Sequence, residues 1–171
     1  SDRRYKKQII FAGRLSSEKG VDVLSDLAKI LPSDINLIIL GSGPKENLIK
    51  NIKKSNVSYF GYLPKNETIS LIRGSDILIQ PSKIEGVSST ILEAMACKVP
   101  VITTNVGGNK EIIEHNKTGI LIEPNNSKKL LDEILNLFIN SKIKNELINS
   151  AYIDVQKYDW KYVGKLYLDL Y

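Results

Sequence analysis

A chain of 171 residues is long enough for one domain, which at this size buries about 70% of the surface of the unfolded chain. The composition, 42% hydrophobic and 25% charged, is that of a globular protein, and the single cysteine excludes an internal disulfide and a multi-cysteine metal site. The net charge of +5 suits an anionic ligand, but the lysines are scattered and no aromatic RNA-binding motif occurs, so we expect no nucleic-acid partner.

Short apolar runs alternate with longer amphipathic runs along most of the sequence. The elements predicted in chain order are a strand at 8–13, a helix at 21–32, a strand at 35–41, a helix at 45–55, a strand at 57–61, a helix at 65–75, a strand at 76–82, a helix at 90–97, a strand at 100–105, a helix at 107–115, a strand at 118–124, and helices near 127–139, 141–153 and 159–170. Pro32 ends the first helix, and Asn66 is the expected N-cap of the third.

This alternation predicts an α/β fold with right-handed βαβ units and parallel strands. We expect a single Rossmann-like domain with a six-stranded parallel sheet, helices on both faces and a helical C-terminal tail, because most of the strands are apolar along their whole length. Ligands of such sheets bind beyond the carboxyl ends of the strands. Glycine and hydroxyl residues, which can approach a ligand closely, follow five of the predicted strands, at Gly13, Gly41 to Gly43, Gly61, 81–89 and 103–108.

Two cations follow the first predicted strand, Arg14 and Lys19 in the run GRLSSEKG. A guanidinium donates two parallel hydrogen bonds and an ammonium acts as a point charge, so the pair can bracket a diphosphate. The structural alternative is that Lys19 pairs with Glu18 or another neighbouring carboxylate at the surface. The later loop GSGPKE lacks the third glycine of a dinucleotide fingerprint, so it predicts close approach of the backbone to a ligand but no NAD site.

The run EGVSSTILEAMA, residues 85–96, leads from a loop into a predicted helix and carries two glutamates. One of the hydroxyl residues 88–90 is expected to cap the helix, whose free N–H groups can bind a phosphate. Glu85 can accept hydrogen bonds from hydroxyls, or it can be an ordinary surface carboxylate. Glu93 can also bind hydroxyls, or it can close a capping box that starts at Thr90 by bonding back to the backbone.

The sequence gives little support for other kinds of site. Carboxylates spaced as D-x-D, which hold a nucleotide-bound divalent ion, do not occur, and we expect no metal. The one histidine, His115, lies in the polar stretch EHNKTG and is expected at the surface. Cys97 lies in an apolar helical context and is expected to be an inert, buried thiol.

The pieces together resemble the carboxyl-terminal, donor-binding domain of the group 1 retaining glycosyltransferases, which have the GT-B fold. The resemblance covers essentially the whole chain. It rests on the runs FAGRLSSEKGVDVL, LIILGSGP, FGYLP, SDILIQPSKIEGVSSTILEAMACKVPVITTNVGGNKEII, TGILIEP and YDWKYVGKLYLDLY. The pair Glu85 and Glu93 forms the E-x7-E motif that is the hallmark of that family.

By that resemblance, Arg14 and Lys19 would hold the diphosphate of a UDP- or GDP-sugar, Glu85 would bind the transferred sugar, and Glu93 would bind the ribose. The other residues implied in donor binding are Gly13, Gly41, Gly43, Gly61, Tyr62, Gly86, Val87, Ser88, Ser89 and Thr90. The implied reaction is hexosyl transfer with retention at the anomeric carbon and without an essential metal. The departing nucleoside diphosphate gains negative charge, which the cations and the helix start can stabilise.

Two positions depart from the family pattern. Val87 and Ser88 stand where many relatives have Phe-Gly, which leaves the donor sugar open. Lys98 stands where glycine is usual after the helix, and because a left-handed exit would strain a lysine, we expect a different turn there.

The resemblance also implies a missing partner, the amino-terminal domain that binds the acceptor. The chain begins without methionine, and we expect a fragment that binds donor weakly and transfers nothing alone. The implied setting is the synthesis of a cell-envelope polysaccharide or glycolipid in the cytoplasm, at the inner face of the plasma membrane, with membrane contact through the missing domain. Two alternatives remain: a sugar-nucleotide epimerase of the same fold, and a non-catalytic module that binds sugar nucleotides.

Overall fold

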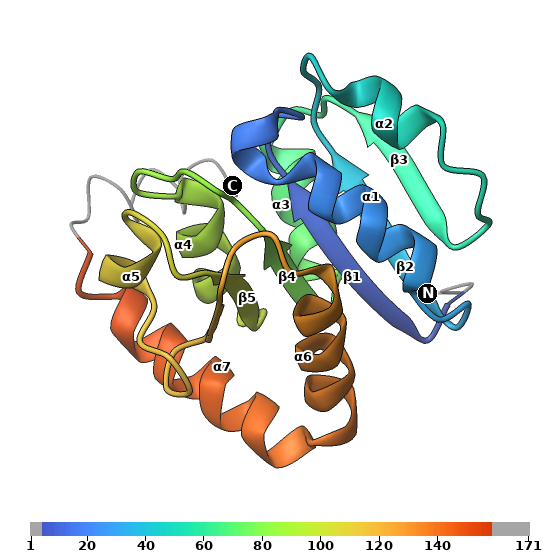
Figure 1. The fold of residues 1–171 in the computed structure, drawn as a ribbon. Helices are drawn as coiled ribbons and strands as arrows, with labels where there is room; N and C mark the ends of the chain where they lie inside the picture. The colour runs from blue at the N-terminus through green and yellow to red at the C-terminus, as the bar shows by residue number, and fades with distance from the viewer. Residues whose placement is uncertain (1–4, 159–171) are drawn as a thin grey trace.

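A six-stranded sheet runs through the middle of the computed structural model, in which residues 5–158 are described (Figure 1). Its strands are β1 (Lys7–Ala12), β2 (Ile35–Leu40), β3 (Val57–Gly61), β4 (Ile77–Gln80), β5 (Val101–Thr104) and β6 (Ile120–Ile122). The strand order is β3-β2-β1-β4-β5-β6, and every neighbouring pair is parallel. The predicted α/β fold with six parallel strands is confirmed.

Helices connect the strands and follow the last of them. They are α1 (Val21–Ile30), α2 (Glu46–Lys50), α3 (Lys65–Arg73), α4 (Ser89–Ala96), α5 (Asn109–Ile112), α6 (Ser127–Ile139) and α7 (Ser141–Val155), with a short 3-10 turn, η1, at Ser17–Lys19. The helix predicted near 159–170 lies outside the described residues. The other predicted elements are all present, although several are shorter than predicted.

Side chains on the two faces of β1 explain why the strands are apolar along their whole length. Ile9 and Phe11 belong to the core that packs against α1 and α6, whereas Ile10 and Ala12 belong to the core that packs against α3, α4 and α5. Successive side chains of a strand point to opposite faces, so a sheet covered on both sides needs apolar residues at every position. In Figure 1, α1 and α6 lie in front of the sheet and α3 lies behind it.

The helix predicted at 45–55 is much shorter in the structure, where α2 spans Glu46–Lys50. The ammonium of Lys54, which the prediction places inside the helix, donates hydrogen bonds to the main-chain oxygens of Ala28 and Leu31, at 2.7 and 2.9 Å. These oxygens lie at the carboxyl end of α1, where helical carbonyls have no partner within their own helix. A contact between segments so far apart in the sequence ends α2 early.

The N-cap predicted for α3 is also wrong. Pro64, with φ −56° and ψ 154°, occupies the N-cap position, and no side chain accepts a hydrogen bond there. Asn66 therefore falls inside the first turn of the helix, two positions beyond the cap. A helix start one or two residues away from its predicted place is enough to remove a predicted cap.

Lys98 adopts the left-handed conformation that we expected a lysine to avoid, with φ of 59°. Its N–H donates to Met95 O at 3.2 Å, and the N–H of Val99 donates to Ala94 O at 2.9 Å. These two hydrogen bonds form a Schellman motif, a common helix ending in which the left-handed position is usually a glycine. The ammonium of Lys98 lies 4.6 Å from the centre of the Tyr152 ring on α7, an attraction that can offset part of the backbone strain.

The strand order places a reversal between β1 and β4, the two strands at the centre of the sheet. In open sheets of this kind, ligands bind in the crevice at such a reversal, beyond the carboxyl ends of the strands. The loops that follow β1, β2, β3 and β4 therefore mark the place to look for a site.

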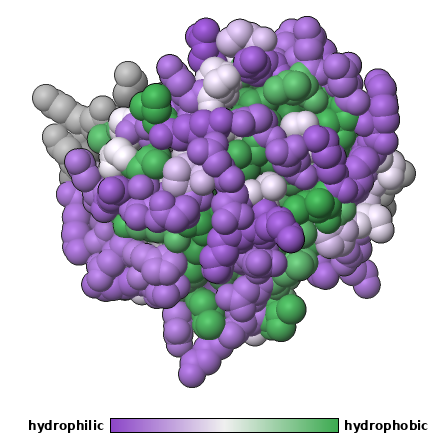
Figure 2. All heavy atoms as spheres, in the orientation of Figure 1, coloured by the Kyte–Doolittle hydropathy of each residue, from purple (hydrophilic) through white to green (hydrophobic). Residues whose placement is uncertain are grey.

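Hydrophilic residues make up most of the face shown in Figure 2, and smaller hydrophobic patches lie between them. Among the helices of residues 5–158, none combines the length and the apolar character that a membrane span requires.

Candidate functional site

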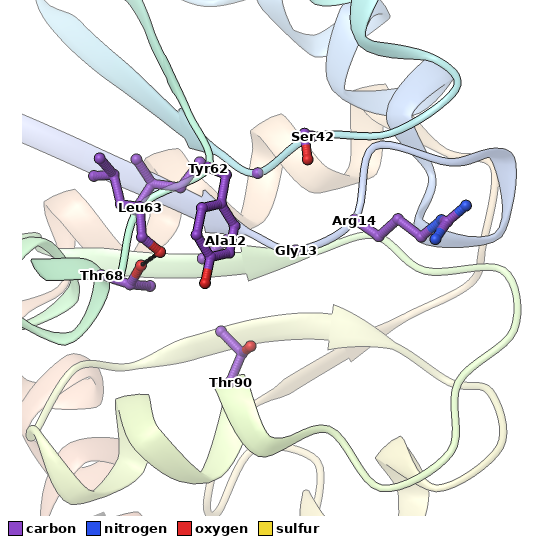
Figure 3. Close-up of a pocket in the computed structure, with 10 residues that line it drawn as sticks. Ala12, Gly13, Arg14, Ser42, Tyr62, Leu63, Thr68 and Thr90 are labelled. Carbon is purple, nitrogen blue, oxygen red and sulfur yellow. Dashed lines mark hydrogen bonds between the residues drawn. The ribbon is translucent and has the colours of Figure 1, made fainter. Parts of the chain in front are cut away.

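A pocket of about 410 Å³ opens at the carboxyl ends of β1 and β2. Its lining comes from the loops after β1, β2 and β3, from α3 and from the start of α4: Ala12, Gly13, Arg14, Leu40, Gly41, Ser42, Tyr62, Leu63, Thr68 and Thr90. In Figure 3 the ring of Tyr62 reaches towards Thr90, while Arg14 extends at the other end of the pocket. The pocket therefore has an aromatic end and a cationic end.

Five residues predicted from the sequence to bind a donor line this pocket: Gly13, Arg14, Gly41, Tyr62 and Thr90. They come from four separate stretches of the chain. The structure brings them to one cavity because those stretches all begin at the same edge of a parallel sheet.

Two of the loops at the pocket are in direct backbone contact. Gly41 has φ of 126°, and a Cβ atom at this position would lie 1.8 Å from the carbonyl oxygen of Gly13. The N–H of Leu15 also donates to the carbonyl oxygen of Ser42 at 2.9 Å. A side chain at position 41 would push the two loops apart, so glycine is required there.

The loop that carries Glu85 and Gly86 is held by the segment after β5. The N–H of Gly108 donates to Glu85 O at 3.0 Å, and a Cβ atom at Gly108 would lie 2.2 Å from Gly86 O. The Thr104 hydroxyl donates to Ser82 O, at the start of the same loop. By contrast, a Cβ atom at Gly86 would meet nothing within 4 Å. The loop is thus fixed on one side and open on the other.

Lys19 and Glu85, 66 residues apart, form a partly buried ion pair. The Lys19 ammonium lies 2.7 Å from both carboxylate oxygens, and the Ser82 hydroxyl donates to one of them at 2.9 Å. The side chain of Glu85 is 8% exposed and that of Lys19 is 28% exposed. Glu85 is therefore not an ordinary surface carboxylate, and the carboxylate that Lys19 contacts is Glu85 rather than Glu18.

Helix α4 begins beside the pocket and is capped by Ser88. The Ser88 hydroxyl accepts a hydrogen bond from the N–H of Ile91 at 3.4 Å. Within the described residues, the N–H groups of Ser89 and Thr90 make no backbone hydrogen bond. These two groups can donate to an anion, and the helix dipole favours negative charge at the same place.

Glu93 lies one turn further along α4 and is 7% exposed. It does not close a capping box, because the cap is Ser88 rather than Thr90; its carboxylate lies 3.6 Å from the Lys65 ammonium on α3. Burial raises the pKa of Glu93, and the nearby charge of Lys65 offsets part of that rise. Glu93 does not itself line the pocket, although Thr90, three residues earlier on α4, does.

Several predicted residues lie outside the pocket lining. Gly61 is at the end of β3, where its carbonyl oxygen accepts from the N–H of Gly41 at 2.7 Å. Gly43 packs against Leu15, and Val87 is 55% exposed beside the open side of the Glu85 loop. These positions shape the loops that surround the pocket.

Leu63 and Thr68 line the pocket although no motif in the sequence predicted them there. Ser42 also lines it, within the run Gly41 to Gly43 that was expected to approach a ligand. For Thr68 the signal was the helical pattern, since the buried residues Ile69 and Ile72 fix which side of α3 faces the sheet. Within residues 5–158, no group of three or more His, Cys, Asp or Glu side chains could hold a metal ion, and metal independence remains a prediction.

A family model described as "Glycosyl transferases group 1" matches residues 3–154. The chain is 34% identical over 156 residues to the uncharacterised glycosyltransferase MJ1178 of Methanocaldococcus jannaschii. The matched region covers 89% of this chain and 44% of that protein. The C-terminal domain of a glycosyl transferase group 1 family protein (LpcC) from Francisella tularensis is 27% identical, with a TM-score of 0.80 over 90% of this chain and 86% of that one.

The structure of Anabaena HepE in complex with UDP-glucose is 23% identical, with a TM-score of 0.81 over 95% of this chain and 48% of that one. HepE is the longer protein, and about half of its chain shares the fold of this one. The chain spans 44 to 48% of the length of the first three curated relatives that it matches.

Proposed function

The chain belongs to the group 1 glycosyltransferase family and corresponds to the C-terminal domain of the GT-B fold, and we propose that it binds the nucleotide-sugar donor. The observation that carries this proposal is the single pocket lined by both Arg14 and Thr90. A guanidinium and the start of a helix are two of the best phosphate-binding groups that a protein offers. Their position at one cavity fits a nucleoside diphosphate.

In the proposed reaction, the bond between the anomeric carbon and the diphosphate oxygen breaks, and the oxygen of an acceptor hydroxyl bonds to that carbon with retained configuration, while the hydroxyl proton passes to the departing diphosphate. Negative charge grows on the departing nucleoside diphosphate. Arg14 and the N–H groups of Ser89 and Thr90 would stabilise this charge from fixed positions, which lowers the barrier more than mobile groups could.

Glu85 would accept hydrogen bonds from the hydroxyls of the transferred sugar, on the open side of its loop. Lys19 keeps that carboxylate in place, because its ammonium lies 2.7 Å from both oxygens. An ammonium has three N–H groups, so the third can donate to the donor diphosphate. In this arrangement Lys19 connects the sugar end of the donor to its phosphate end.

The relatives are about twice as long as this chain, so the complete reaction needs more than the described domain. We propose that a further domain supplies the acceptor site and that the product is a polysaccharide or glycolipid made at the inner face of the plasma membrane. The complex of Anabaena HepE makes UDP-glucose the first donor to test.

Replacing Glu93 with glutamine is expected to stabilise the free chain at pH 7 and to weaken donor binding about tenfold. Because burial raises the pKa of Glu93 above 4.5, this carboxyl adds stability below that pH, and the contribution is lost as the pH rises through the raised pKa. Glutamine carries no charge at pH 7, so the cost of burying an ionised carboxylate is removed. Glutamine is, however, a weaker hydrogen-bond acceptor for ribose hydroxyls than a carboxylate. Urea unfolding at pH 7 and pH 4 and calorimetry with UDP-glucose measure the two effects.

Glu67→Gln, an exposed change on α3, is the matched control and should alter neither quantity. Unchanged affinity in Glu93→Gln would contradict the ribose role of Glu93. If neither UDP- nor GDP-sugars raise the melting temperature of the unaltered chain at millimolar concentration, the donor proposal itself fails, since a ligand at a hundred times its Kd adds about 2.7 kcal/mol.

A further inference from the structure

We propose that Lys65 is a positioning residue, which holds the Glu93 carboxylate ionised and in place for the ribose of the donor. This inference rests on the proposed function, in which Glu93 binds the ribose, and it adds a residue to that site. It follows from where Lys65 lies on α3, from the burial of Glu93 and from the position of both side chains relative to the pocket.

An ion pair between Lys65 and Glu93 connects two helices that border the pocket. The Lys65 ammonium, on α3, lies 3.6 Å from a carboxylate oxygen of Glu93, on α4. Thr68 follows Lys65 by three residues and Thr90 precedes Glu93 by three, and both threonines line the pocket. Side chains three residues apart on a helix are neighbours. The pair can therefore act on the site, although neither of its members lines the pocket.

Lys65 stands where a helix disfavours a cation. It is the first residue of α3, and no side chain caps that end of the helix. The helix dipole favours negative charge in the first turn, and Glu67 supplies such a charge there. A residue that breaks a local rule is expected at a functional site, where another interaction compensates for it. The contact of Lys65 with Glu93 is such an interaction.

Glu93 needs a cation because it is buried. Its side chain is 8% exposed, whereas that of Lys65 is 45% exposed. Burial disfavours the charged carboxylate and raises the pKa of Glu93, and Lys65 acts in the opposite direction. An ionised carboxylate can accept from both hydroxyls of a ribose, whereas a protonated carboxyl carries an O–H donor in place of one acceptor. Lys65 therefore favours the form of Glu93 that fits a diol.

Among the described residues, Lys65 is the cation whose charge acts on Glu93. The strands β4 and β5, which α4 packs against, carry no ionisable side chain. Other charged or titratable side chains around α3, α4 and α7 have contacts of their own: Arg73 with the Cys97 thiol, Lys98 with the Tyr152 ring and Lys157 with Asp154. Burial, and to a smaller extent the charge of Glu93, raise the pKa of the Cys97 thiol, so Cys97 stays neutral beside the pair.

The test is calorimetric titration of the 171-residue chain and of Lys65→Met with UDP-glucose at pH 6 and pH 8. We expect Lys65→Met to raise the Kd about tenfold at pH 6 and much less at pH 8, because Glu93 without its cation is protonated more at the lower pH. At pH 6, titrations in buffers of different ionisation enthalpy should show that the variant releases more protons on binding than the unaltered chain. Lys65→Arg, which keeps the charge, should restore the unaltered values.

Lys129→Met is the matched control. Lys129 is 51% exposed and pairs with Glu133 on α6, which packs on the other face of the sheet. This change also removes one positive charge, but it should alter neither the Kd nor the proton release. In a chain that already carries Glu93→Gln, Lys65→Met should have no further effect that depends on pH, because glutamine does not titrate.

The outcomes separate this inference from the proposed function. If Lys65→Met weakens the binding of UDP-glucose by the same factor at both pH values, or not at all, the role of Lys65 is overturned while the donor site stands. Should Lys65→Met fail to fold, Lys65→Gln is titrated in its place and the same results decide. If the unaltered chain does not bind UDP-glucose at either pH, the donor site itself fails, and this inference fails with it.

Discussion

Replacing Lys19 with methionine is expected to lower the free energy of unfolding by about 2–3 kcal/mol. Glu85 is 8% exposed, so without the ammonium its charge would remain buried with the Ser82 hydroxyl as its one side-chain donor among the described residues. Water can reach Lys19 in part, since that side chain is 28% exposed, which keeps the loss below that of a fully buried pair. Urea unfolding at pH 7 measures the change.

The matched control is Lys29→Met, because Lys29 pairs with Asp26 in an exposed ion pair of 70% and 58% side-chain exposure. That change should alter the stability by less than about 0.5 kcal/mol. Adding Glu85→Gln to Lys19→Met should restore most of the lost stability, because the buried charge disappears. Equal stability of the Lys19→Met and Lys29→Met variants would show that the pair between Lys19 and Glu85 is not a buried one.

Replacing Gly41 with alanine is expected to lower the free energy of unfolding by about 3 kcal/mol and to abolish donor binding. The new methyl group would lie 1.8 Å from the carbonyl oxygen of Gly13, and a φ of 126° is strained for any residue with a side chain. The loops after β1 and β2 must separate to admit it, and both of them line the pocket. Thermal unfolding followed by titration with UDP-glucose measures both losses.

Gly86→Ala is the control for this experiment, since its methyl group would meet nothing within 4 Å. It should unfold like the unaltered chain. If Gly41→Ala were as stable as Gly86→Ala, the close contact between the first two strand-end loops would be wrong.

Local patterns in the sequence predicted the parts of the fold that depend on neighbouring residues. The strand at 57–61 and the helix at 127–139 match β3 and α6 in both bounds. Continuous apolar runs predicted a sheet covered on both faces, because both sides of each strand need apolar residues. Local patterns could not predict the order of the strands in the sheet, because that order depends on which helix packs on which face.

The errors arise where distant parts of the chain meet. Lys54 ends α2 early by bonding to the end of α1, and no helical pattern records that contact. The capping box from Thr90 to Glu93, one of two readings of Glu93, does not form because the N-cap is Ser88, two residues before Thr90. Lys98 takes a glycine conformation where Tyr152, on another helix, lies against its ammonium.

The sequence predicted that glycines and cations after parallel strands gather at one edge of the sheet, and the pocket lies at that edge. It could not predict that Lys19 and Glu85 contact each other, since their loops are 66 residues apart. It also missed Leu63 and Thr68, because their place at the pocket depends on how α3 sits against the sheet.

The most direct test of the donor site is a map of backbone amide chemical shifts in the 171-residue chain during titration with UDP-glucose. We predict that the largest shifts fall at residues 13–14, 62–63 and 88–90, at the two ends of the pocket and the start of α4. Shifts concentrated instead around Phe60 and Glu67, in the separate pocket on α3, or no shifts at millimolar ligand, would contradict the account.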